Sequence, residues 1–421
     1  MRVLWITNVK LPIISRMQDG NNKVNIGGWL DRISQGLLQN KSIELVVCYP
    51  YGKSEKGAIN NLTYYGIPYD GKKMRLGCLD DESGVHEAER ILSEVKPDII
   101  HIHGTEFQYH CFFAQAAKNL GIEDKLLVSI QGLVSVYAKH YALNLPTSVK
   151  YAVTIREMVG RKNIYAGIKN FEKRGLYEEK TIKLTPNIMG RTSWDKACTY
   201  RLNSKAEYYV GNETLRESFY SGEWKAEKCV QQRIFISQAS YPVKGFHLFI
   251  EALRDIVSFY PNVSVHVSGV DITKETGVFG NSYGIYISKQ LKKYNLTNAV
   301  HFCGSLNETQ MKQEMLEANV FVSPSTIENS PNSVGEAMLL GVPIVSSNVG
   351  GVADLLKDKE EGYLYQSDAP YMLAYYVMQV FKDFERASVM GQNARKHAAI
   401  THSYENNLKC LLDVYHQISK K

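Results

Sequence analysis

The stretch that decides the fold is 320–346, with the sequence VFVSPSTIENSPNSVGEAMLLGVPIVS. A short apolar strand opens it, a loop follows, and a helix then runs until Gly341 and Pro343 end it before a second strand. Ser330 and Pro331 fit a helix N-cap followed by proline at the first helical position. This order of elements predicts one unit of a parallel sheet, in which a crossover helix joins neighbouring strands.

Two carboxylates, Glu328 and Glu336, flank the predicted start of this helix. Glu328 follows a strand at the carboxyl edge of the sheet, where open α/β sheets bind ligands. The amides of Asn332 and Ser333 open the helix and form a natural site for an anion such as a diphosphate. Carboxylates accept hydrogen bonds from hydroxyl groups, so the pattern fits a ligand with both hydroxyls and phosphates. The alternative is that both glutamates only complement the helix dipole.

The rest of the chain alternates short β-rich runs with amphipathic helical stretches, which predicts parallel sheets covered by helices on both faces. The expected strands are Val3–Thr7, Ile43–Tyr49, Leu62–Ile67, Ile99–His103, Leu126–Ile130, a run that resumes at Ile188, Arg233–Ser237, Val263–Ser268, Val300–Phe302, Val320–Ser323 and Ile344–Ser347.

A chain of 421 residues is too long for one ordinary core and predicts two domains. We expect the boundary near residues 225–232, with a first domain at 1–228 and a second at 229–402. A final segment, 403–421, carries a helix with an apolar stripe, and we expect that helix to return to the first domain.

The composition is that of a soluble globular enzyme, with 44% hydrophobic and 22% charged residues. No run is apolar enough for a signal peptide or a membrane span, so we expect a cytoplasmic protein. Seven scattered cysteines without a C-x-x-C pair indicate neither a disulfide framework nor a zinc site, and we expect no structural metal. The net charge of +6 lies mostly in the first half, which suits an anionic partner or a membrane surface.

The segments ENSPNSVGEAM (328–338) and GVPIVSSNVGG (341–351) together resemble the donor-site signature of glycosyltransferase family 4. That family consists of retaining enzymes of the GT-B fold, an α/β fold with two facing Rossmann-like domains. The resemblance implies that Glu328 contacts hydroxyls of the donor sugar and that Glu336 holds the ribose. It also implies that a stretch of backbone lies along the sugar and phosphates, namely that of Asn329, Ser330, Pro331, Asn332 and Ser333.

Two segments of the first half extend the resemblance. IGGWL (26–30) resembles the glycine pair that opens the family's first helix, so Gly27 and Gly28 are expected near the donor phosphates. DIIHIHG (98–104) resembles the strand end that supplies a histidine to the cleft. His103 matches that position, whereas His101 is expected to be buried on the strand.

FISQASYPVKG (235–245) resembles the first strand and loop of the family's donor domain, with two departures. The family usually has an arginine and a lysine that reach the diphosphate. Lys244 is present, but Gln238 stands at the arginine position and brings no charge. Gln131 stands where many members have histidine, and it retains hydrogen bonding without acid–base capacity. These departures leave the choice of donor and the rate open.

The resemblance implies front-face transfer of a sugar, with the leaving diphosphate taking the proton of the acceptor. His103, Lys244 and Glu328 are the catalytic candidates, and the absence of a D-x-D motif predicts that no metal cofactor is required. The expected partners are a sugar nucleotide (a UDP-sugar first, a GDP-sugar second) and a glycan or polyprenyl-diphosphate-linked acceptor. The resemblance to polysaccharide-assembly members indicates bacterial surface-glycan synthesis.

Other classes of protein fit the sequence to different degrees. A sugar-nucleotide 2-epimerase of GT-B architecture and a non-catalytic sugar-nucleotide-binding protein stay open as alternatives. A dehydrogenase is excluded because no G-x-G-x-x-G follows the first strand. Nucleic-acid binding is not indicated, because the sequence has neither aromatic residues interleaved with basic ones nor a known nucleic-acid-binding motif.

Residues 150–183 form a basic, helical stretch with nine Lys/Arg against four Glu. Interspersed apolar residues include Met158, Val159, Ile164 and Ile168, which suits an element lying on anionic lipid. We therefore expect an acceptor-side or membrane-facing surface on the first domain, with peripheral contact at the inner face of the cell membrane. A solvated helical face, or one that grips the donor phosphates, is the alternative.

Overall fold

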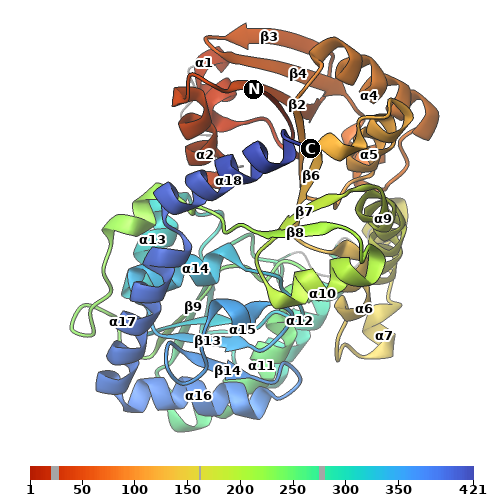
Figure 1. Cartoon of the computed structure of the whole chain (residues 1–421). Coiled ribbons are helices and arrows are strands. Elements are labelled where there is room, and N and C mark those ends of the chain that lie inside the picture. The colour runs from red at the N-terminus through yellow and green to blue at the C-terminus, as the bar shows by residue number, and fades with distance from the viewer. Residues whose placement is uncertain (20–27, 161–162, 275–279) are drawn as a thin grey trace. The chain divides into compact units, whose positions relative to one another are not determined.

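The computed structural model describes residues 1–19, 28–160, 163–274 and 280–421 (Figure 1). These residues form two compact units. Unit 1 consists of Met1–Ala138, Asn170–Leu215 and His402–Lys421, and unit 2 of Lys139–Lys169 and Arg216–Thr401.

The chain enters unit 2 at Arg216, which differs from the expected boundary near 225–232. The segment that follows Arg216 packs on unit 2 through specific hydrogen bonds. The Trp224 backbone N–H donates to Leu340 O at 2.7 Å, and its indole Nε1–H donates to Ala318 O at 2.7 Å. Residues 139–169 also belong to unit 2, although 1–228 was the expected extent of the first domain.

Unit 1 contains an eight-stranded sheet in the order β3-β4-β2-β1-β5-β6-β7-β8. Every neighbouring pair is parallel except β3 and β4. The strands are β1 (Arg2–Ile6), β2 (Glu44–Tyr51), β3 (Glu55–Ile59), β4 (Leu62–Pro68), β5 (Ile99–His103), β6 (Leu126–Ser129), β7 (Asn187–Gly190) and β8 (Glu207–Val210).

Helices cover both faces of this sheet, because successive residues of β1 enter two different cores. Leu4 and Ile6 join the core beneath α4 (Asp81–Val95) and α5 (Gln108–Asn119), whereas Val3 and Trp5 join the core beneath α2 (Gly28–Gln39) and α18 (Tyr404–Ile418). The helices of unit 1 include α1 (Pro12–Asp19), α2 (Gly28–Gln39), α3 (Gly71–Arg75), α4 (Asp81–Val95), α5 (Gln108–Asn119), α10 (Ser193–Leu202) and α18 (Tyr404–Ile418). Two more, α6 (Val134–His140) and α9 (Ile164–Leu184), contain the points where the chain passes between the units.

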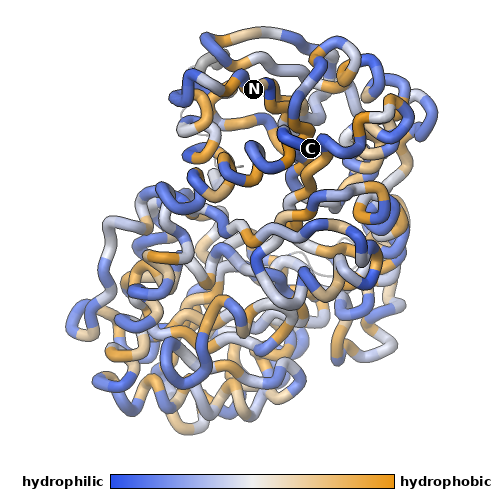
Figure 2. The backbone as a smooth tube through the Cα atoms, in the orientation of Figure 1, coloured by the Kyte–Doolittle hydropathy of each residue, from blue (hydrophilic) through white to orange (hydrophobic). Residues whose placement is uncertain are grey.

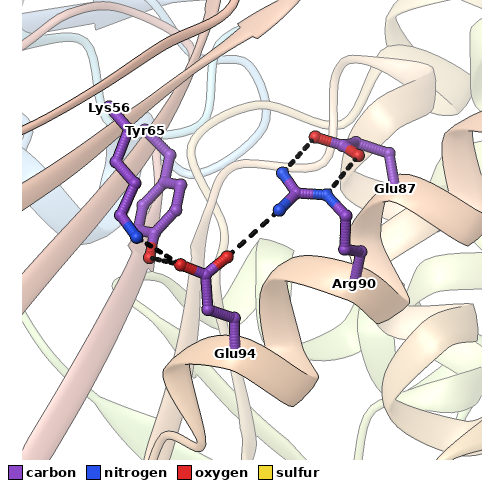
Figure 3. A network of polar contacts seen from close by, with 5 residues as sticks. All are labelled: Lys56, Tyr65, Glu87, Arg90 and Glu94. Atoms are coloured by element: carbon purple, nitrogen blue, oxygen red, sulfur yellow. Dashed lines mark hydrogen bonds and ion pairs between the residues drawn. The ribbon is translucent and has the colours of Figure 1, made fainter.

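The antiparallel edge strand β3 lacks a continuous apolar run and was not predicted from the sequence, and neither were β8 and β14. A polar network fixes β3 to α4 (Figure 3). Lys56 of β3 pairs with Glu94, which also accepts a hydrogen bond from Tyr65 at 3.1 Å. Arg90 donates to Glu94 at 3.1 Å and to both oxygens of Glu87 at 2.8 Å. Because the Lys56 and Arg90 side chains are 59% and 50% exposed, solvent screens these ion pairs and the network adds little to stability.

Unit 2 contains a six-stranded parallel sheet in the order β11-β10-β9-β12-β13-β14. Its strands are β9 (Arg233–Ile236), β10 (Ser264–Val267), β11 (Val300–Phe302), β12 (Val320–Ser323), β13 (Ile344–Ser347) and β14 (Tyr363–Tyr365). Its helices include α7 (Thr147–Lys150), α8 (Ile155–Gly160), α11 (Phe246–Phe259), α12 (Ser282–Lys293), α13 (Glu308–Glu317), α14 (Asn332–Leu340), α15 (Val352–Leu355), α16 (Pro370–Lys382) and α17 (Phe384–Thr401).

Both sheets are doubly wound, so the predicted α/β class with two Rossmann-like domains is confirmed. Hydrophobic segments are concentrated along the interior strands, and hydrophilic stretches lie mainly in outer helices and loops (Figure 2). Among the described helices, none is long and apolar enough to cross a membrane.

The C-terminal helix α18 is fixed to the sheet of unit 1 by a buried hydrogen-bond chain as well as by its apolar stripe. Trp5 Nε1–H donates to the Tyr415 hydroxyl at 2.7 Å, and that hydroxyl is also hydrogen-bonded to His101 Nδ1 at 2.7 Å. The other ring nitrogen of His101, Nε2, is hydrogen-bonded to Ser129 Oγ at 2.7 Å. Burial and the neighbouring His103 hold the pKa of His101 well below its usual value, so the ring is neutral.

Tyr415→Phe tests this chain of hydrogen bonds. Loss of the hydroxyl leaves two buried groups without a partner, and we expect the free energy of unfolding to fall by about 1–3 kcal/mol. Urea denaturation measures the change. Tyr200→Phe, at a 65% exposed tyrosine of the same unit, is the matched control. Equal losses in the two variants would show that the buried chain contributes nothing.

Candidate functional site

The centre of unit 2 is a topological switch point between β9 and β12. These strands are parallel neighbours, while the chain continues from β9 to β10 and β11 on one side and then crosses to β12 on the other. Open α/β sheets bind ligands outside the carboxyl ends of the strands at such a point. The loops that leave β9 and β12 carry Lys244 and Glu328.

Lys244 and Glu328 form an ion pair between these two loops, with Nζ and Oε1 2.6 Å apart. The side chains are only 22% and 11% exposed. Burial alone would lower the pKa of Lys244, but the adjacent Glu328 carboxylate outweighs burial and raises that pKa above its usual value. Ser325 Oγ–H also donates to Glu328 Oε1 at 2.9 Å. The loops thus present a fixed cation and a fixed carboxylate side by side.

Two glycines allow these loops to approach so closely. Gly245 has a φ of +68°, and a Cβ there would lie 1.7 Å from Pro324 O. Gly350 has a φ of +53°, and a Cβ there would lie 1.9 Å from Glu328 O. The Gly351 N–H donates to the same Glu328 carbonyl at 3.1 Å. Only glycine can adopt a positive φ without strain and also leave room for the neighbouring carbonyl oxygen at positions 245 and 350.

Glu336, the second carboxylate of the motif, lies in α14 and is 4% exposed. Arg216 binds it in a bidentate manner, with Nε–Oε1 at 2.6 Å and Nη2–Oε2 at 2.7 Å. Burial lowers the pKa of Arg216, but Glu336 more than offsets this effect and the pKa is raised. Each carboxylate oxygen keeps a second lone pair, so Glu336 can still accept hydrogen bonds from hydroxyl groups. Arg216 was not predicted as a site residue, because nothing in its local sequence marks it.

The helix that follows Glu328 begins later than the sequence indicated. α14 starts at Asn332, and Pro331 occupies the N-cap position without a side-chain cap, so the prediction of Ser330 as N-cap was wrong. The first helical bond runs from Val334 N–H to Pro331 O at 3.0 Å. The amides of Asn332 and Ser333 therefore precede this bond, as an anion site at the helix start requires. Asn329 is 1% exposed, whereas Ser330 is half-buried.

Gln238 lies in the same loop as Lys244 and is half-buried. Its Nε2–H donates to Ser240 Oγ at 3.3 Å, within the loop itself. The structure therefore brings together Lys244, Glu328 and the start of α14, with Gln238 in an adjoining position.

His103 lies in unit 1, at the end of β5 and thus at the switch point between β1 and β5. It lines a pocket with an empty volume of about 570 Å³, part of it open to solvent. The other lining residues come from α2, from α18 and from the ends of β5 to β8, and include Trp29, His101, Arg191 and Asn407.

Burial lowers the pKa of His103 to about 3, so its ring is neutral. Its Nε2 is buried and has no hydrogen-bond partner among the described residues. A neutral ring nitrogen in a pocket can accept a hydrogen bond from a bound hydroxyl group or donate one to it.

The predicted glycine pair lies at the start of α2. Gly28 is the first residue of α2 and is half-buried, whereas Gly27 lies outside the described residues.

The basic stretch 150–183 differs from the expected surface in three respects. Its first part, to Lys169, belongs to unit 2. Ile164 and Ile168 are buried in the core of that unit. Arg174 is 8% exposed and its guanidinium lies 4.7 Å from the centre of the Phe171 ring, so it was wrongly assigned to an open basic face. Arg161 and Lys162 lie outside the described residues.

Comparisons with known proteins identify similar families and folds. Residues 225–397 match the family model described as "Glycosyl transferases group 1". Within unit 2, this segment is therefore similar to the glycosyltransferases of that family.

The D-inositol 3-phosphate glycosyltransferase of Corynebacterium urealyticum is 23% identical over 184 residues, 42% of this chain and 41% of that relative. An uncharacterized glycosyltransferase of Methanocaldococcus jannaschii is 25% identical over 182 residues, 43% of this chain and 44% of that relative. The alignments thus span less than half of the length of these curated relatives.

Two solved structures resemble nearly the whole chain. Sucrose-phosphate synthase from Thermosynechococcus elongatus has a TM-score of 0.71 at 14% identity and covers 99% of each chain. HepE of Anabaena in complex with UDP-glucose has a TM-score of 0.64 at 15% identity, covering 98% of this chain and 99% of the other. The fold is therefore GT-B, as predicted.

Gly245→Ala tests whether the close approach of the two loops positions Lys244. Gly304 is a matched control, because its φ is +72° but a Cβ there would meet nothing within 4 Å. Both variants incur the cost of a left-handed alanine, about 1–2 kcal/mol. We expect Gly245→Ala to lower the thermal midpoint clearly further, because of the clash with Pro324. Equal midpoints would contradict the assigned role of Gly245.

Proposed function

We propose that this chain is a retaining glycosyltransferase that moves a sugar from a nucleoside-diphosphate sugar to a glycan or lipid-linked acceptor. The observation that carries the proposal is the Lys244–Glu328 pair at the switch point of unit 2, in the segment that matches the glycosyl transferases group 1 family. Relatives named as glycosyltransferases support it, as does the fold shared with a protein that binds UDP-glucose.

Breaking the bond between the anomeric carbon and the diphosphate oxygen places negative charge on the leaving group and positive charge on the sugar. A fixed cation and oriented amides stabilise that negative charge best when they are already in position. Lys244 supplies the cation, and the amides of Asn332 and Ser333 supply the dipoles. Glu328 accepts hydrogen bonds from sugar hydroxyls, and Glu336 accepts those of the ribose.

His103 is assigned, within unit 1, as a neutral hydrogen-bonding group toward a sugar hydroxyl, as the family resemblance implies. With a pKa of about 3 it does not serve as a cation, so its contribution is orientation. Gln238 and the segment that contains Gly27 and Gly28 are assigned to the phosphates, as the family resemblance implies. We propose a UDP-sugar as the donor, with a GDP-sugar as the second choice, and a reaction that requires no metal ion.

Glu328→Ala and Glu336→Ala separate the two carboxylate roles. A ribose contact stabilises the ground state and the transition state equally, so its loss weakens donor binding. A contact to the transferred sugar can strengthen in the transition state, so its loss also slows the reaction. We expect Glu336→Ala to weaken donor binding tenfold or more, corresponding to about 1.5–3 kcal/mol for a charged hydrogen bond. Glu328→Ala should lower kcat as well.

Steady-state kinetics across a panel of UDP- and GDP-sugars provides the measurement. Glu385→Ala, at an exposed residue of α17, is the control and should keep wild-type kinetics. Wild-type kinetics in both motif variants would remove Glu328 and Glu336 from the site.

The stereochemistry of the product is a further test. We expect NMR of the product to show the anomeric configuration of the donor, and turnover to continue in EDTA. An inverted product would exclude the proposed front-face mechanism. Binding of labelled donor without turnover would favour a sugar-nucleotide-binding protein, and a product with an inverted C2 centre on the nucleotide sugar would favour a 2-epimerase.

The acceptor side of the proposal includes peripheral contact with an anionic membrane. Between residues 151 and 159, large apolar side chains are exposed: Tyr151 (54%), Val153 (54%), Ile155 (49%), Met158 (65%) and Val159 (81%). The buried Glu157 anchors this apolar segment to unit 2 by accepting hydrogen bonds from Ser282 N–H and Oγ–H, both at 2.8 Å. An exposed apolar surface of this kind marks an interaction site, and the neighbouring basic residues favour lipid headgroups.

Met158→Glu combined with Val159→Glu tests this surface. Each side chain contributes about 1.5–3 kcal/mol when buried, so the double variant should lose binding to anionic vesicles by more than tenfold. Flotation with vesicles of mixed neutral and anionic phospholipid measures the bound fraction. Val270→Glu combined with Val389→Glu, at exposed valines of the same unit, adds the same charge as a control. A wild-type chain that ignores these vesicles at low salt would leave a soluble acceptor as the better assignment.

A further inference from the structure

A group of metal-binding side chain types lies in unit 2 on elements other than the Lys244 and Glu328 loops. His266 belongs to β10, Cys303 directly follows β11, and Glu314 belongs to α13. One ligand atom from each residue lies within 4.8 Å of the other two. All three residues are half-buried, so an ion could reach them from solvent.

The sheet register explains why these residues meet. His266 of β10 is the direct partner of His301 of β11, so both side chains lie on the same face of the sheet. The backbone pairing continues through Cys303, whose N–H donates to Val267 O at 2.8 Å, and Cys303 lies two residues after His301 on that face. On the same face, Glu314 Oε2 lies 2.8 Å from His266 Nδ1.

The donor set suits zinc. Zn²⁺ takes imidazole nitrogen, thiolate sulfur and carboxylate oxygen at about 2.0–2.3 Å, so its ligand atoms lie about 3.3–3.8 Å apart in a tetrahedron. Side-chain rotation alone can bring atoms within 4.8 Å to that spacing. His301 is exposed, its ring centre lies 5.6 Å from that of His266, and it can supply the fourth ligand.

We propose that His266, Cys303 and Glu314 form a zinc site that joins the edge strand β11, its neighbour β10 and helix α13. β11 is only three residues long and lies at an edge of the sheet, so a metal link would stabilise that edge. The sequence predicted no metal because the ligands come from three separate elements and share no close spacing.

The alternative is that these residues bind no metal and form only a His266–Glu314 hydrogen bond beside a half-buried thiol. Titration of the full chain with Co²⁺ and with Zn²⁺ distinguishes the two. We expect one equivalent of Co²⁺ to produce a thiolate-to-metal charge-transfer band in the near ultraviolet, and Zn²⁺ to displace it. At a Zn²⁺ concentration 100 times its Kd, the folding equilibrium should shift about 100-fold toward the native state.

Cys303→Ser should abolish the cobalt band, and both His266→Gln and Glu314→Gln should weaken Zn²⁺ binding at least tenfold. Cys229→Ser, at another half-buried cysteine of unit 2, should behave as the wild type. Circular dichroism of each variant checks its fold. The proposal is overturned if the wild type shows no cobalt–thiolate band, or if the band and the zinc-dependent stabilisation persist in Cys303→Ser.

Discussion

A largely buried ion pair between Lys244 and Glu328 joins the two loops at the switch point of unit 2. Burying two charges costs free energy, and their attraction offsets that cost only when the geometry is good and further hydrogen bonds are present. The 2.6 Å separation and the hydrogen bond from Ser325 meet these conditions. Apolar residues at these two positions would suffice for stability. We therefore interpret the ion pair as a site for a ligand that carries both negative charge and hydroxyl groups.

The fold determines where this pair lies. In each sheet the strand order reverses once between central strands, and the loops leaving those strands carry the candidate residues. Lys244 and Glu328 follow β9 and β12 in unit 2, and His103 ends β5 beside β1 in unit 1. In unit 2 the loops approach closely because Gly245 and Gly350 accept backbone conformations and contacts that no larger residue could. The backbone therefore fixes the side chains before any ligand arrives.

Much of this arrangement could be predicted from the sequence. Strands β5, β11, β12 and β13 were predicted with their observed bounds, because buried parallel strands are continuous apolar runs between loop residues. Strand β3 was missed, because its sequence EKGAI contains no continuous apolar run and it lies at an edge of the sheet. Ser330 was misassigned as N-cap because proline at position 331 can serve either as cap or as first helical residue, and local sequence does not decide between them.

The partners of the candidate residues were harder to predict than the residues themselves. Arg216 reaches Glu336 only through tertiary packing of the segment before β9, and no local pattern marks such a contact. The same holds for the burial of Arg174, whose guanidinium lies 5.3 Å from the centre of the Phe107 ring, and which removed a charge from the expected basic face. Charge patterns in a sequence locate basic residues, but only the fold shows which of them are accessible.

Isothermal titration calorimetry of Lys244→Met with UDP and with uridine tests the central claim most directly. If Lys244 holds the diphosphate, the variant should lose tenfold or more in affinity for UDP, about 1.4 kcal/mol or more, while its affinity for uridine stays unchanged. The ratio of the two affinities is an internal control, because a misfolded variant would lose both. An unchanged preference for UDP over uridine would contradict the placement of Lys244 at the diphosphate.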